Sequence, residues 1–545
     1  MTEPSTLCTV TFEPSGAVVC VARGSTVRRA ASEADVALDF PCGGLGVCGG
    51  CTVAVAGMLE PPEDDECVLI RAQDLAAGVR LACRARVAGD VTVRSTHAAA
   101  TSKMRVVKAG DLGRIRIEPP ERRGIAGDEL LLGAAVDIGT TTVVVSIVDL
   151  RTGARCGSAS APNPQHAFGH DVLSRIAHVA AYGGDSLRGP IVSTIHELTL
   201  RVLSECGSSV DHLREIAIAG NTTMIHLLLR IDPSPLGTAP YGPAFVAPLE
   251  QPAADIGLIR LGSARAYVLP GVSAFIGADI TAGLLATGLA ERDTPSVFVD
   301  LGTNGEIVVR TSHGLLAAST AAGPALEGAS IESGMRAETG AIERVALVDG
   351  ELRLETIGGV APRGLCGSGL LDLIAVLLDT AILDATGRFR EGAPHPLASR
   401  VTQRDGIRVF EIVAGIYLTQ RDVRQVQLAN AAIASGIVIL LETAGLAADD
   451  VCELVIAGGF GYHVQAGALV RMGMIPAAWA PRVSFAGNTA LTGATVALLD
   501  SGARRRAEAI ARHVTTIDLA SRPDFQERFV GAMTFPQSEQ AVEGE

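Results

Sequence analysis

The pattern of apolar and polar positions changes character twice along the chain. Residues 8–14 and 17–25 are typical of strands joined by a Pro-Ser-Gly turn, and a helix-like run follows them. Residues 81–95 are expected to close this part as a pair of strands, so we predict a small mixed β unit over residues 1–97. Residues 98–131 are polar and are interrupted by proline and glycine, which predicts a linker or a small docking element.

From residue 133 the chain becomes apolar again, and one hairpin pattern occurs twice. An apolar strand ends at Asp137 in VDIGTTT, a tight turn follows, and a β-branched strand runs back. A similar arrangement returns 163 residues later at Asp300, in VDLGTNGEI. Two copies of a hairpin predict an internally duplicated α/β fold. We place its halves at 132–292 and 293–535, followed by a flexible tail at 536–545.

Both turns carry the chemistry of a phosphate site. An aspartate carboxylate can hold Mg²⁺ through water, and the backbone and hydroxyl groups of such a turn can cradle phosphate oxygens. A third element, the strand and glycine turn of LVIAGGFGYH, lets the backbone pass close to an adenine ring or ribose. The candidate ATP-binding residues are Asp137, Gly139, Thr140, Thr141, Asp300, Gly302, Thr303, Asn304, Gly305, Gly458, Gly459, Phe460 and Gly461.

These three elements resemble, in order, the phosphate 1, phosphate 2 and adenosine motifs of the ASKHA superfamily of sugar kinases, actin and Hsp70. Each motif alone is common in strand turns, and the ordered set is what indicates ATP binding. Two further segments, AGNTT at 219–223 and AGNTA at 486–490, echo each other as strand-end turns that lead into helices. We interpret this echo as consistent with the duplication.

The ASKHA resemblance also implies a catalytic carboxylate. In ASKHA kinases a carboxylate upstream of the phosphate 2 motif activates the attacking hydroxyl, and Asp279 in AFIGADITAGLL matches it, 21 residues before Asp300. We expect Asp279 to orient a water molecule. The alternative is a helix N-cap, because Asp279 precedes an apolar helical run. Glu306 and Glu327 are further acidic candidates near the γ-phosphate, and the alternative for each is a solvated side chain.

A glycine-rich loop near the N-terminus gathers cysteines. Cys42, Cys48 and Cys51 have the spacing C-x5-C-x2-C among five glycines, and Cys83 follows in LACRAR. Four thiolates at such spacing can hold a two-iron, two-sulfur cluster, and glycines let the loop wrap it closely. The alternatives are a structural zinc site or buried free thiols. Zinc sites usually repeat C-x2-C, whereas the second pair is split here, which favours the cluster.

The cysteine run resembles the adrenodoxin-like branch of the ferredoxins, with one residue more in the first gap than the plant-type pattern has. This resemblance implies a β-grasp fold for residues 1–97. It also implies that Cys42 and Cys48 bind one iron, and that Cys51 and Cys83 bind the other.

Composition limits the classes of function. At 545 residues the chain is too long for one core, and its hydrophobic content of 48% suits α/β domains with buried strands. A net charge of −14 without a basic patch argues against a nucleic-acid partner. Eleven cysteines, an odd number, fit a reducing compartment. No signal peptide is visible, and the apolar run 425–441 indicates a buried helix, so we expect a cytoplasmic protein without membrane contact.

Taken over nearly its whole length, the chain resembles the reductive activators of corrinoid proteins, which rescue cobalamin-dependent methyltransferase systems. The resemblance rests on VDIGTTT, VDLGTNGEI, TAAGPALEGASI, GLCGSGLLDL and IAGGFG. It implies a multidomain protein of α/β and α+β class, in which a β-grasp 2Fe-2S ferredoxin domain precedes a duplicated ASKHA ATPase domain. Only about 35 residues join the two domains, where the family is expected to have a longer linker and an intermediate domain. Partner docking therefore transfers less directly than ATP or cluster binding.

The same resemblance implies a function. The protein would reduce an inactive corrinoid Co(II) to Co(I) with an electron from the cluster, in a step driven by ATP and Mg²⁺. The implied partners are a corrinoid protein of a methyltransferase system and an upstream low-potential electron donor, and related proteins are expected to form homodimers.

Two other functions remain open at this point. An ATP-dependent activator of a non-corrinoid enzyme would use a four-iron cluster between two subunits, and no cysteine pair for it is visible in the ATPase half. A small-molecule ASKHA kinase with an accessory cluster would form a phosphorylated product.

Overall fold

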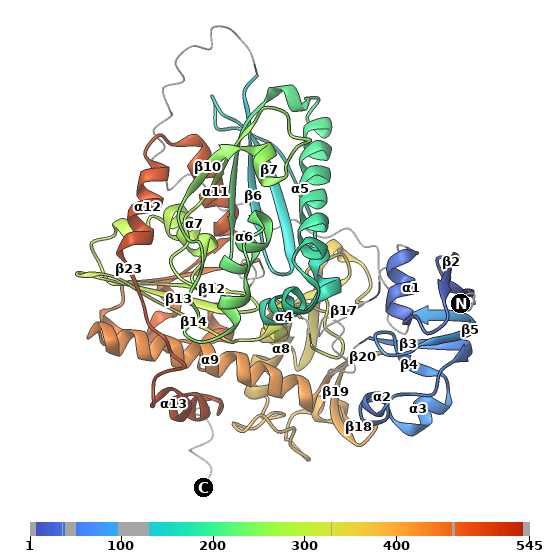
Figure 1. The fold of residues 1–545 in the computed structure, drawn as a ribbon. Coiled ribbons are helices and arrows are strands. Elements are labelled where there is room, and N and C mark those ends of the chain that lie inside the picture. The colour runs from blue at the N-terminus through green and yellow to red at the C-terminus, as the bar shows by residue number, and fades with distance from the viewer. Residues whose placement is uncertain are drawn as a thin grey trace.

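A computed structural model describes residues 7–34, 36, 38, 51–95, 130–328, 330–459 and 464–537. A small N-terminal domain lies beside a larger body that is built on two sheets (Figure 1). One contact between the two parts is at helix α4 (Val172–Tyr182), where the Arg28 guanidinium lies 5.8 Å from the centroid of the Tyr182 ring.

The N-terminal domain is a mixed sheet with short helices. Within the described residues its strand order is β2-β1-β5-β3-β4, with β1 parallel to β5 and the other neighbours antiparallel. Its elements are β1 (Leu7–Glu13), β2 (Ala17–Ala22), α1 (Val27–Glu33), β3 (Thr52–Leu59), α2 (Asp64–Leu69), α3 (Ala72–Ala76), β4 (Val79–Leu81) and β5 (Val87–Ser95). The predicted mixed β unit is confirmed, but β4 and β5 flank β3 instead of pairing with each other.

The first sheet of the larger body has the order β10-β11-β9-β6-β7-β8 over the residues described. Its strands are β6 (Leu132–Ile138), β7 (Thr142–Asp149), β8 (Arg155–Pro162), β9 (Leu213–Gly220), β10 (Leu249–Pro252) and β11 (Arg265–Val268). The accompanying helices are α4 (Val172–Tyr182), α5 (Asp185–Glu205), α6 (Thr222–Leu229) and α7 (Ala278–Thr287). Strand β6 is almost wholly buried, as expected for an apolar strand in a covered sheet.

The second sheet has the order β22-β21-β12-β13-β14-β23 in the same part of the model. Its strands are β12 (Ser296–Leu301), β13 (Gly305–Thr311), β14 (Gly314–Thr320), β21 (Glu453–Ala457), β22 (Val483–Gly487) and β23 (Val514–Thr516). The helices are α8 (Gly367–Asp379), α9 (Gln420–Ala444), α10 (Ala466–Arg471), α11 (Thr489–Leu499), α12 (Ala503–His513) and α13 (Phe525–Ala532). Two small sheets are added: β15 (Ala341–Val348), β16 (Glu351–Thr356) and β17 (Gly364–Leu365), then β18 (Val401–Arg404), β19 (Ile407–Val413) and β20 (Ile416–Thr419).

The duplication predicted from the sequence is visible in the sheet topology. Strands β6 and β12 occupy the same place, each antiparallel to the next strand in the chain and parallel to a later one, β9 or β21. The AGNTT and AGNTA segments do form strand-end turns that lead into helices α6 and α11. They are not equivalent copies, however, because AGNTT follows β9 whereas AGNTA follows β22, whose counterpart is β11. The echo is therefore not evidence of the duplication.

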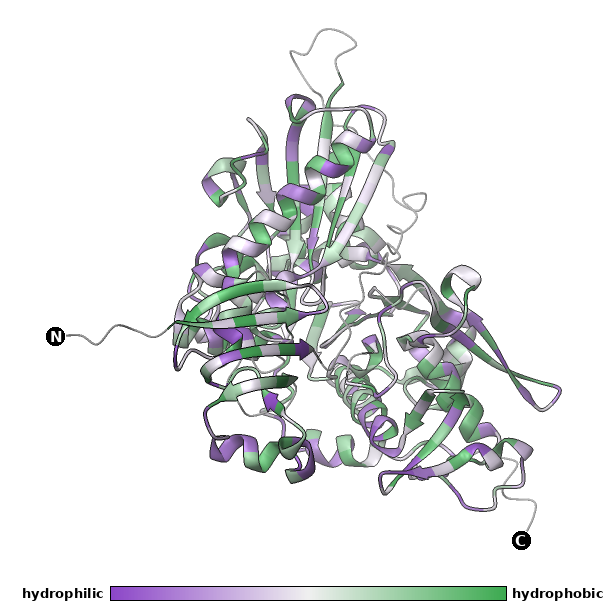
Figure 2. Ribbon diagram, turned by 90° about the vertical axis from the view of Figure 1, so that its right-hand side faces the viewer, coloured by the Kyte–Doolittle hydropathy of each residue, from purple (hydrophilic) through white to green (hydrophobic). Residues whose placement is uncertain are grey.

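Helix α9 is a core helix. It is the helix of the described chain that is long and apolar enough to cross a membrane by length and composition, but 78% of its most apolar window is buried in the protein. It packs on β13 and β14, so the buried helix predicted at 425–441 is confirmed. Figure 2 shows hydrophobic residues along the central strands, whereas hydrophilic ones are frequent on outer helices and hairpins.

The C-terminal helices join the two halves. Helix α11 packs on β6, β9 and α7, and α12 also packs on α7, so residues late in the chain complete the core around the first sheet. The cavity described next lies at this junction.

Candidate functional site

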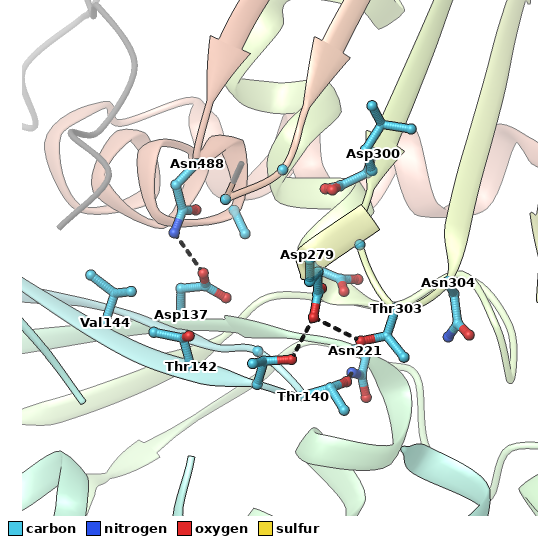
Figure 3. A pocket seen from close by; sticks show the side chains of 18 of the residues that line it. Asp137, Thr140, Thr142, Val144, Asn221, Asp279, Asp300, Thr303, Asn304 and Asn488 are labelled. Carbon is cyan, nitrogen blue, oxygen red and sulfur yellow. Dashed lines mark hydrogen bonds between the residues drawn. The ribbon is translucent and has the colours of Figure 1, made fainter. Parts of the chain in front are cut away.

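The two predicted hairpin turns face each other across one cavity. Its volume is about 230 Å³, and its lining comes from both sheets (Figure 3). The lining residues include Asp137, Gly139, Thr140, Thr141, Asn221, Asp279, Asp300, Gly302, Thr303, Asn304, Glu306, Glu327, Arg336, Gly458, Gly459 and Asn488.

The first turn, residues 139–141, is a tight connection between β6 and β7. The Gly139 N–H donates to Thr142 O at 2.9 Å, and a Cβ on Gly139 would lie only 2.8 Å from that oxygen. Only glycine fits this position without displacing the backbone. Thr140 lines the cavity, and its Oγ1 accepts from Asn221 Nδ2 at 2.9 Å.

The second turn, residues 302–304, likewise connects two antiparallel strands, β12 and β13, with a different closing hydrogen bond. The Gly302 N–H donates to Asn304 O at 3.1 Å, and Thr303 and Asn304 line the cavity. Gly305 does not line it: a Cβ there would lie 2.8 Å from Thr320 Oγ1 and 2.9 Å from Ile433. Gly305 thus serves close packing against helix α9.

The third predicted element reaches the same cavity. Gly458 and Gly459 follow β21 and line it, whereas Phe460 and Gly461 lie outside the described residues. Gly458 has a φ of +108°, and a Cβ there would lie 2.2 Å from Leu301 O. Glycine is therefore required for this turn to pass next to the end of β12.

Acidic side chains dominate the electrostatics of the cavity. Of the described residues, five carboxylates line it: Asp137, Asp279, Asp300, Glu306 and Glu327. Burial raises the pKa of Asp300 to about 8, with further contributions from the charges of Asp279, Asp137 and Glu327. Burial likewise raises the pKa of Asp137 to about 7, although a hydrogen bond from Asn488 opposes this rise. Burial and mutual repulsion disfavour the ionised carboxylates, so a bound cation would stabilise their charged form.

The two glutamates have different partners. Burial raises the pKa of both, and that of Glu306 lies well above its usual range. Glu306 accepts from Ser319 Oγ at 3.2 Å, whereas Glu327 Oε2 accepts from Thr141 Oγ1 at 2.8 Å and from Thr303 Oγ1 at 3.2 Å. Glu327 thereby connects the two hairpin turns.

The residues fit a magnesium site that a nucleotide completes. In the described chain no group of three or more His, Cys, Asp or Glu side chains could hold a metal by itself. Mg²⁺ is usually bound by one or two carboxylates, water and substrate phosphates, and the Asp137 and Asp300 carboxylates in the cavity lining are compatible with such a site.

Asp279 is placed as a cavity residue and not as a helix cap. Helix α7 begins at Ala278 with Gly277 as its N-cap, so the alternative that Asp279 is the cap is wrong. Its Oδ1 accepts from the Ile280 N–H at 2.9 Å, and burial raises its pKa to about 6. Asp279 lies in the first helical turn, where a carboxylate is also favoured by the helix dipole.

Two asparagines were missed as site residues from the sequence. Asn221 and Asn488 are the N-caps of α6 and α11, and each directs its amide into the cavity. Asn488 Nδ2 donates to Asp137 Oδ2 at 2.7 Å, as Figure 3 shows. The repeated AGNT segment was the signal, because the asparagine in each copy both caps a helix and reaches a hairpin turn.

The N-terminal domain holds the second candidate site. Cys51 and Cys83 are buried free cysteines whose Sγ atoms lie 3.2 Å apart. The hydrogen bond with Cys83 lowers the pKa of Cys51 to about 7, which favours a ligating thiolate. Cys42 and Cys48 lie outside the described residues. Two converging buried thiols fit one half of an iron–sulfur site.

A buried ion pair holds the strand that precedes Cys83. Arg80 makes a two-pronged contact with Glu66, at 2.9 and 2.6 Å, and Glu66 Oε1 also accepts from the Leu81 N–H at 2.9 Å. Both side chains are almost fully buried. This pair fixes β4, and with it the position from which Cys83 extends.

Comparison with protein families matches three segments. Residues 10–88 match the 2Fe-2S iron-sulfur cluster binding domain, residues 132–292 match the RACo middle region, and residues 294–543 match the C-terminal domain of RACo, the ASKHA domain.

Similar proteins agree with these matches. The corrinoid activation enzyme RamQ of Eubacterium limosum is 37% identical over 73% of this chain and 70% of its own. The [Co(II) methylated amine-specific corrinoid protein] reductase of Methanosarcina barkeri is 24% identical over 71% of this chain and 73% of its own. A solved reductive activator for corrinoid,iron-sulfur protein has a TM-score of 0.72 and 29% identity, covering 98% of this chain and 100% of that one. This chain therefore belongs to the family of reductive activators of corrinoid proteins.

Proposed function

We propose that this protein reduces the Co(II) of an inactive corrinoid protein to Co(I), with an electron from a 2Fe-2S cluster and with ATP bound between the two hairpin turns. The observation that carries the proposal is that both turns and the glycine turn after β21 converge on one cavity, in a chain that also holds a buried cysteine pair. Relatives named as a corrinoid activation enzyme and a Co(II) corrinoid protein reductase support the substrate.

The cluster would be held by Cys42, Cys48, Cys51 and Cys83, and it supplies one-electron transfer when bound. Plant-type clusters have potentials near roughly −400 mV, and each ~59 mV is worth about 1.4 kcal/mol for one electron. Reduction of a corrinoid Co(II) needs a still lower potential, so a further source of free energy is required. ATP is the source that this chain is equipped to bind.

Each group around the cavity has a distinct role in the proposed ATP site. The turns at 139–141 and 302–304 bind phosphate oxygens, and Gly458 and Gly459 leave room for the adenosine. Asp137 and Asp300 would hold Mg²⁺, which neutralises phosphate charge when bound. Asp279 orients a water for attack on the γ-phosphate.

Binding in a cleft between two halves favours closure of those halves. Helix α4 connects this event to the cluster domain, because Arg175 in its first half donates to Thr140 O at 2.6 Å and Tyr182 at its end contacts Arg28. Nucleotide binding would thereby reposition the cluster domain and dock the corrinoid partner. ATP acts on geometry and electrostatics in this scheme, and no phosphorylated product is formed.

The test is anaerobic visible spectroscopy of Co(II) corrinoid carrier proteins, including a methylated amine-specific one, mixed with the reduced protein. We expect Co(I) absorption that depends on Mg-ATP and is lost in Cys83→Ala and Asp300→Ala, but not in the Cys67→Ala control outside the cysteine pattern. Equal ATP consumption with and without each carrier, while all cobalt stays Co(II), would refute the proposal.

A further inference from the structure

Arg175 is a fully buried cation beneath the first hairpin turn. It extends from helix α4, and its Nη2 donates to Thr140 O at 2.6 Å while its Nε donates to Gly169 O at 2.9 Å. Its Nη1 donates to Gln165 Oε1 at 3.1 Å. All these oxygens are neutral, and among the described residues no carboxylate forms an ion pair with Arg175, although the charge of Asp171 also acts on it. Buried guanidinium groups are normally paired, so a buried guanidinium without a contacting carboxylate favours an anion nearby.

Asn163 supports the same turn from its other side. It is fully buried, and its Nδ2 donates to Gly139 O at 2.8 Å. Its Oδ1 accepts from the Gln165 N–H at 3.0 Å, which caps the 3₁₀ helix Pro164–Phe168. Two consecutive carbonyls of the turn, at Gly139 and Thr140, are thus each held by a buried side-chain donor.

This arrangement sets the direction of the next two N–H groups. In a trans peptide the C=O and N–H bonds point in opposite directions. With Gly139 O directed to Asn163 and Thr140 O directed to Arg175, the N–H groups of Thr140 and Thr141 point away from these side chains, toward the cavity that both threonines line. Within the part of the chain that the structure describes, neither N–H has a hydrogen-bond partner. Unpartnered backbone donors at a cavity wall are suited to an oxygen-rich ligand.

The second hairpin turn lacks this support. In the described chain no side chain donates to the carbonyls of Gly302 or Thr303. Arg336 is the basic residue among the described lining of the cavity, against five carboxylates, so Arg175 is the additional positive charge close to the phosphate position. The two halves of the duplicated site are therefore unequal.

We propose that Arg175 and Asn163 are positioning residues of the phosphate site: they fix two carbonyls so that the Thr140 and Thr141 N–H groups receive a nucleotide phosphate, and Arg175 adds a buried positive charge beneath it. The inference rests on the proposed ATP binding. It assigns to the first turn the role of the rigid anion receptor and leaves the second turn to adapt.

The test measures the affinity of the full-length protein for Mg-ATP and for adenosine by calorimetry. Arg175→Gln removes the positive charge, whereas Arg175→Lys keeps the charge but loses the planar guanidinium group that contacts several oxygens. Asn163→Ser keeps a side-chain cap for the 3₁₀ helix but removes the amide donor. Arg188→Gln is the matched control, because Arg188 likewise donates to two backbone carbonyls, Leu228 O at 2.8 Å and Ile256 O at 2.7 Å, neither of which belongs to a hairpin turn of the cavity.

We expect Arg175→Gln to weaken Mg-ATP binding by about tenfold to a hundredfold, the scale of a charge-assisted hydrogen bond, with adenosine affinity within about twofold of wild type. Asn163→Ser should weaken Mg-ATP binding by about fivefold, and Arg175→Lys should weaken it less than Arg175→Gln does. Arg188→Gln should bind both ligands like wild type.

Each other outcome has a definite reading. Wild-type Mg-ATP affinity in Asn163→Ser and in the Arg175 variants overturns the inference, and so does an equal loss of ATP and adenosine binding, which marks a structural role alone. If Arg175→Gln does not fold, Arg175→Lys and Asn163→Ser decide by the same criteria. If the wild-type protein binds no Mg-ATP, the proposed function itself is refuted, an outcome that differs from a loss of binding in the variants alone.

Discussion

Thr141 and Glu327 are hydrogen-bonded across the cleft, with Thr141 Oγ1 donating to Glu327 Oε2 at 2.8 Å. The same carboxylate oxygen accepts from Thr303 Oγ1 at 3.2 Å, so one acid connects the turns of both halves. A phosphate group between the turns competes for these two hydroxyls, and the charge of Glu327 repels it.

We predict that Glu327→Gln tightens nucleotide binding. Removal of one buried negative charge lowers the repulsion of a triphosphate, and we expect a gain of about threefold to tenfold that is larger without Mg²⁺ than with it. Titration calorimetry with ATP, with and without Mg²⁺, measures this. Glu332→Gln, at an exposed side chain, should match wild type, and weaker binding by Glu327→Gln would contradict the prediction.

The pH dependence of stability follows from Asp300. Its pKa in the folded protein is about 8, because burial and the charges of Asp279, Asp137 and Glu327 disfavour ionisation. In the unfolded chain an aspartate titrates near roughly 3.9. The folded state thus binds this proton more tightly, and stability falls as pH rises through the window between the two values. Asp137, with a pKa of about 7, acts in the same direction.

The unfolding temperature without Mg²⁺ and nucleotide should therefore fall between about pH 5 and about pH 8. Calorimetric scans should show a smaller fall for Asp300→Asn, whereas Asp255→Asn, at an exposed position, keeps the wild-type slope. A wild-type unfolding temperature that rises over this range would show that these carboxyl groups do not dominate the pH dependence of stability.

Asp279 is predicted to act in hydrolysis more than in binding. Asp279→Asn keeps the size of the side chain and removes the acceptor for a proton, so ATP turnover should fall by about 10²- to 10⁴-fold while Mg-ATP affinity stays within about threefold. A coupled phosphate-release assay and calorimetry give the two quantities, and Asp293→Asn, at an exposed residue after α7, serves as the control. Unchanged turnover would remove Asp279 from the mechanism.

Loss of one cysteine of the buried pair should abolish the cluster without closing the ATP site. Cys83→Ala and Cys51→Ala are expected to lose visible absorption and bound iron after anaerobic reconstitution, because three thiolates cannot complete the set. Cys67→Ala, at an exposed cysteine, should keep both. Mg-ATP affinity should be the same in all three variants, and full iron content in Cys83→Ala would contradict the assigned ligand set.

The sequence by itself determined which chemistry the chain contains. The informative features are local ones: the spacing of Cys51 and Cys83, the turns after Asp137 and Asp300, and the glycines after β21. The turns can be recognised because a tight turn requires glycine wherever it lies in the fold. The strands could also be predicted from local sequence, because alternating apolar and polar residues and β-branched runs indicate a strand before its neighbours in the sheet are known. The family and its domain order could therefore be recognised from short segments.

Only the tertiary structure decided which polar groups share the cavity. Asn488 reaches Asp137 across 351 residues, and Thr141 reaches Glu327 across 186, when the two sheets pack together. It also showed that Gly305 serves packing, that Gly277 caps the helix of Asp279, and that the two AGNT segments occupy unequal positions. Arg175 and Asn163 gave no signal in the sequence, because neither belongs to a motif. Their role arises from burial beside backbone carbonyls, a relation between distant segments that no local pattern encodes.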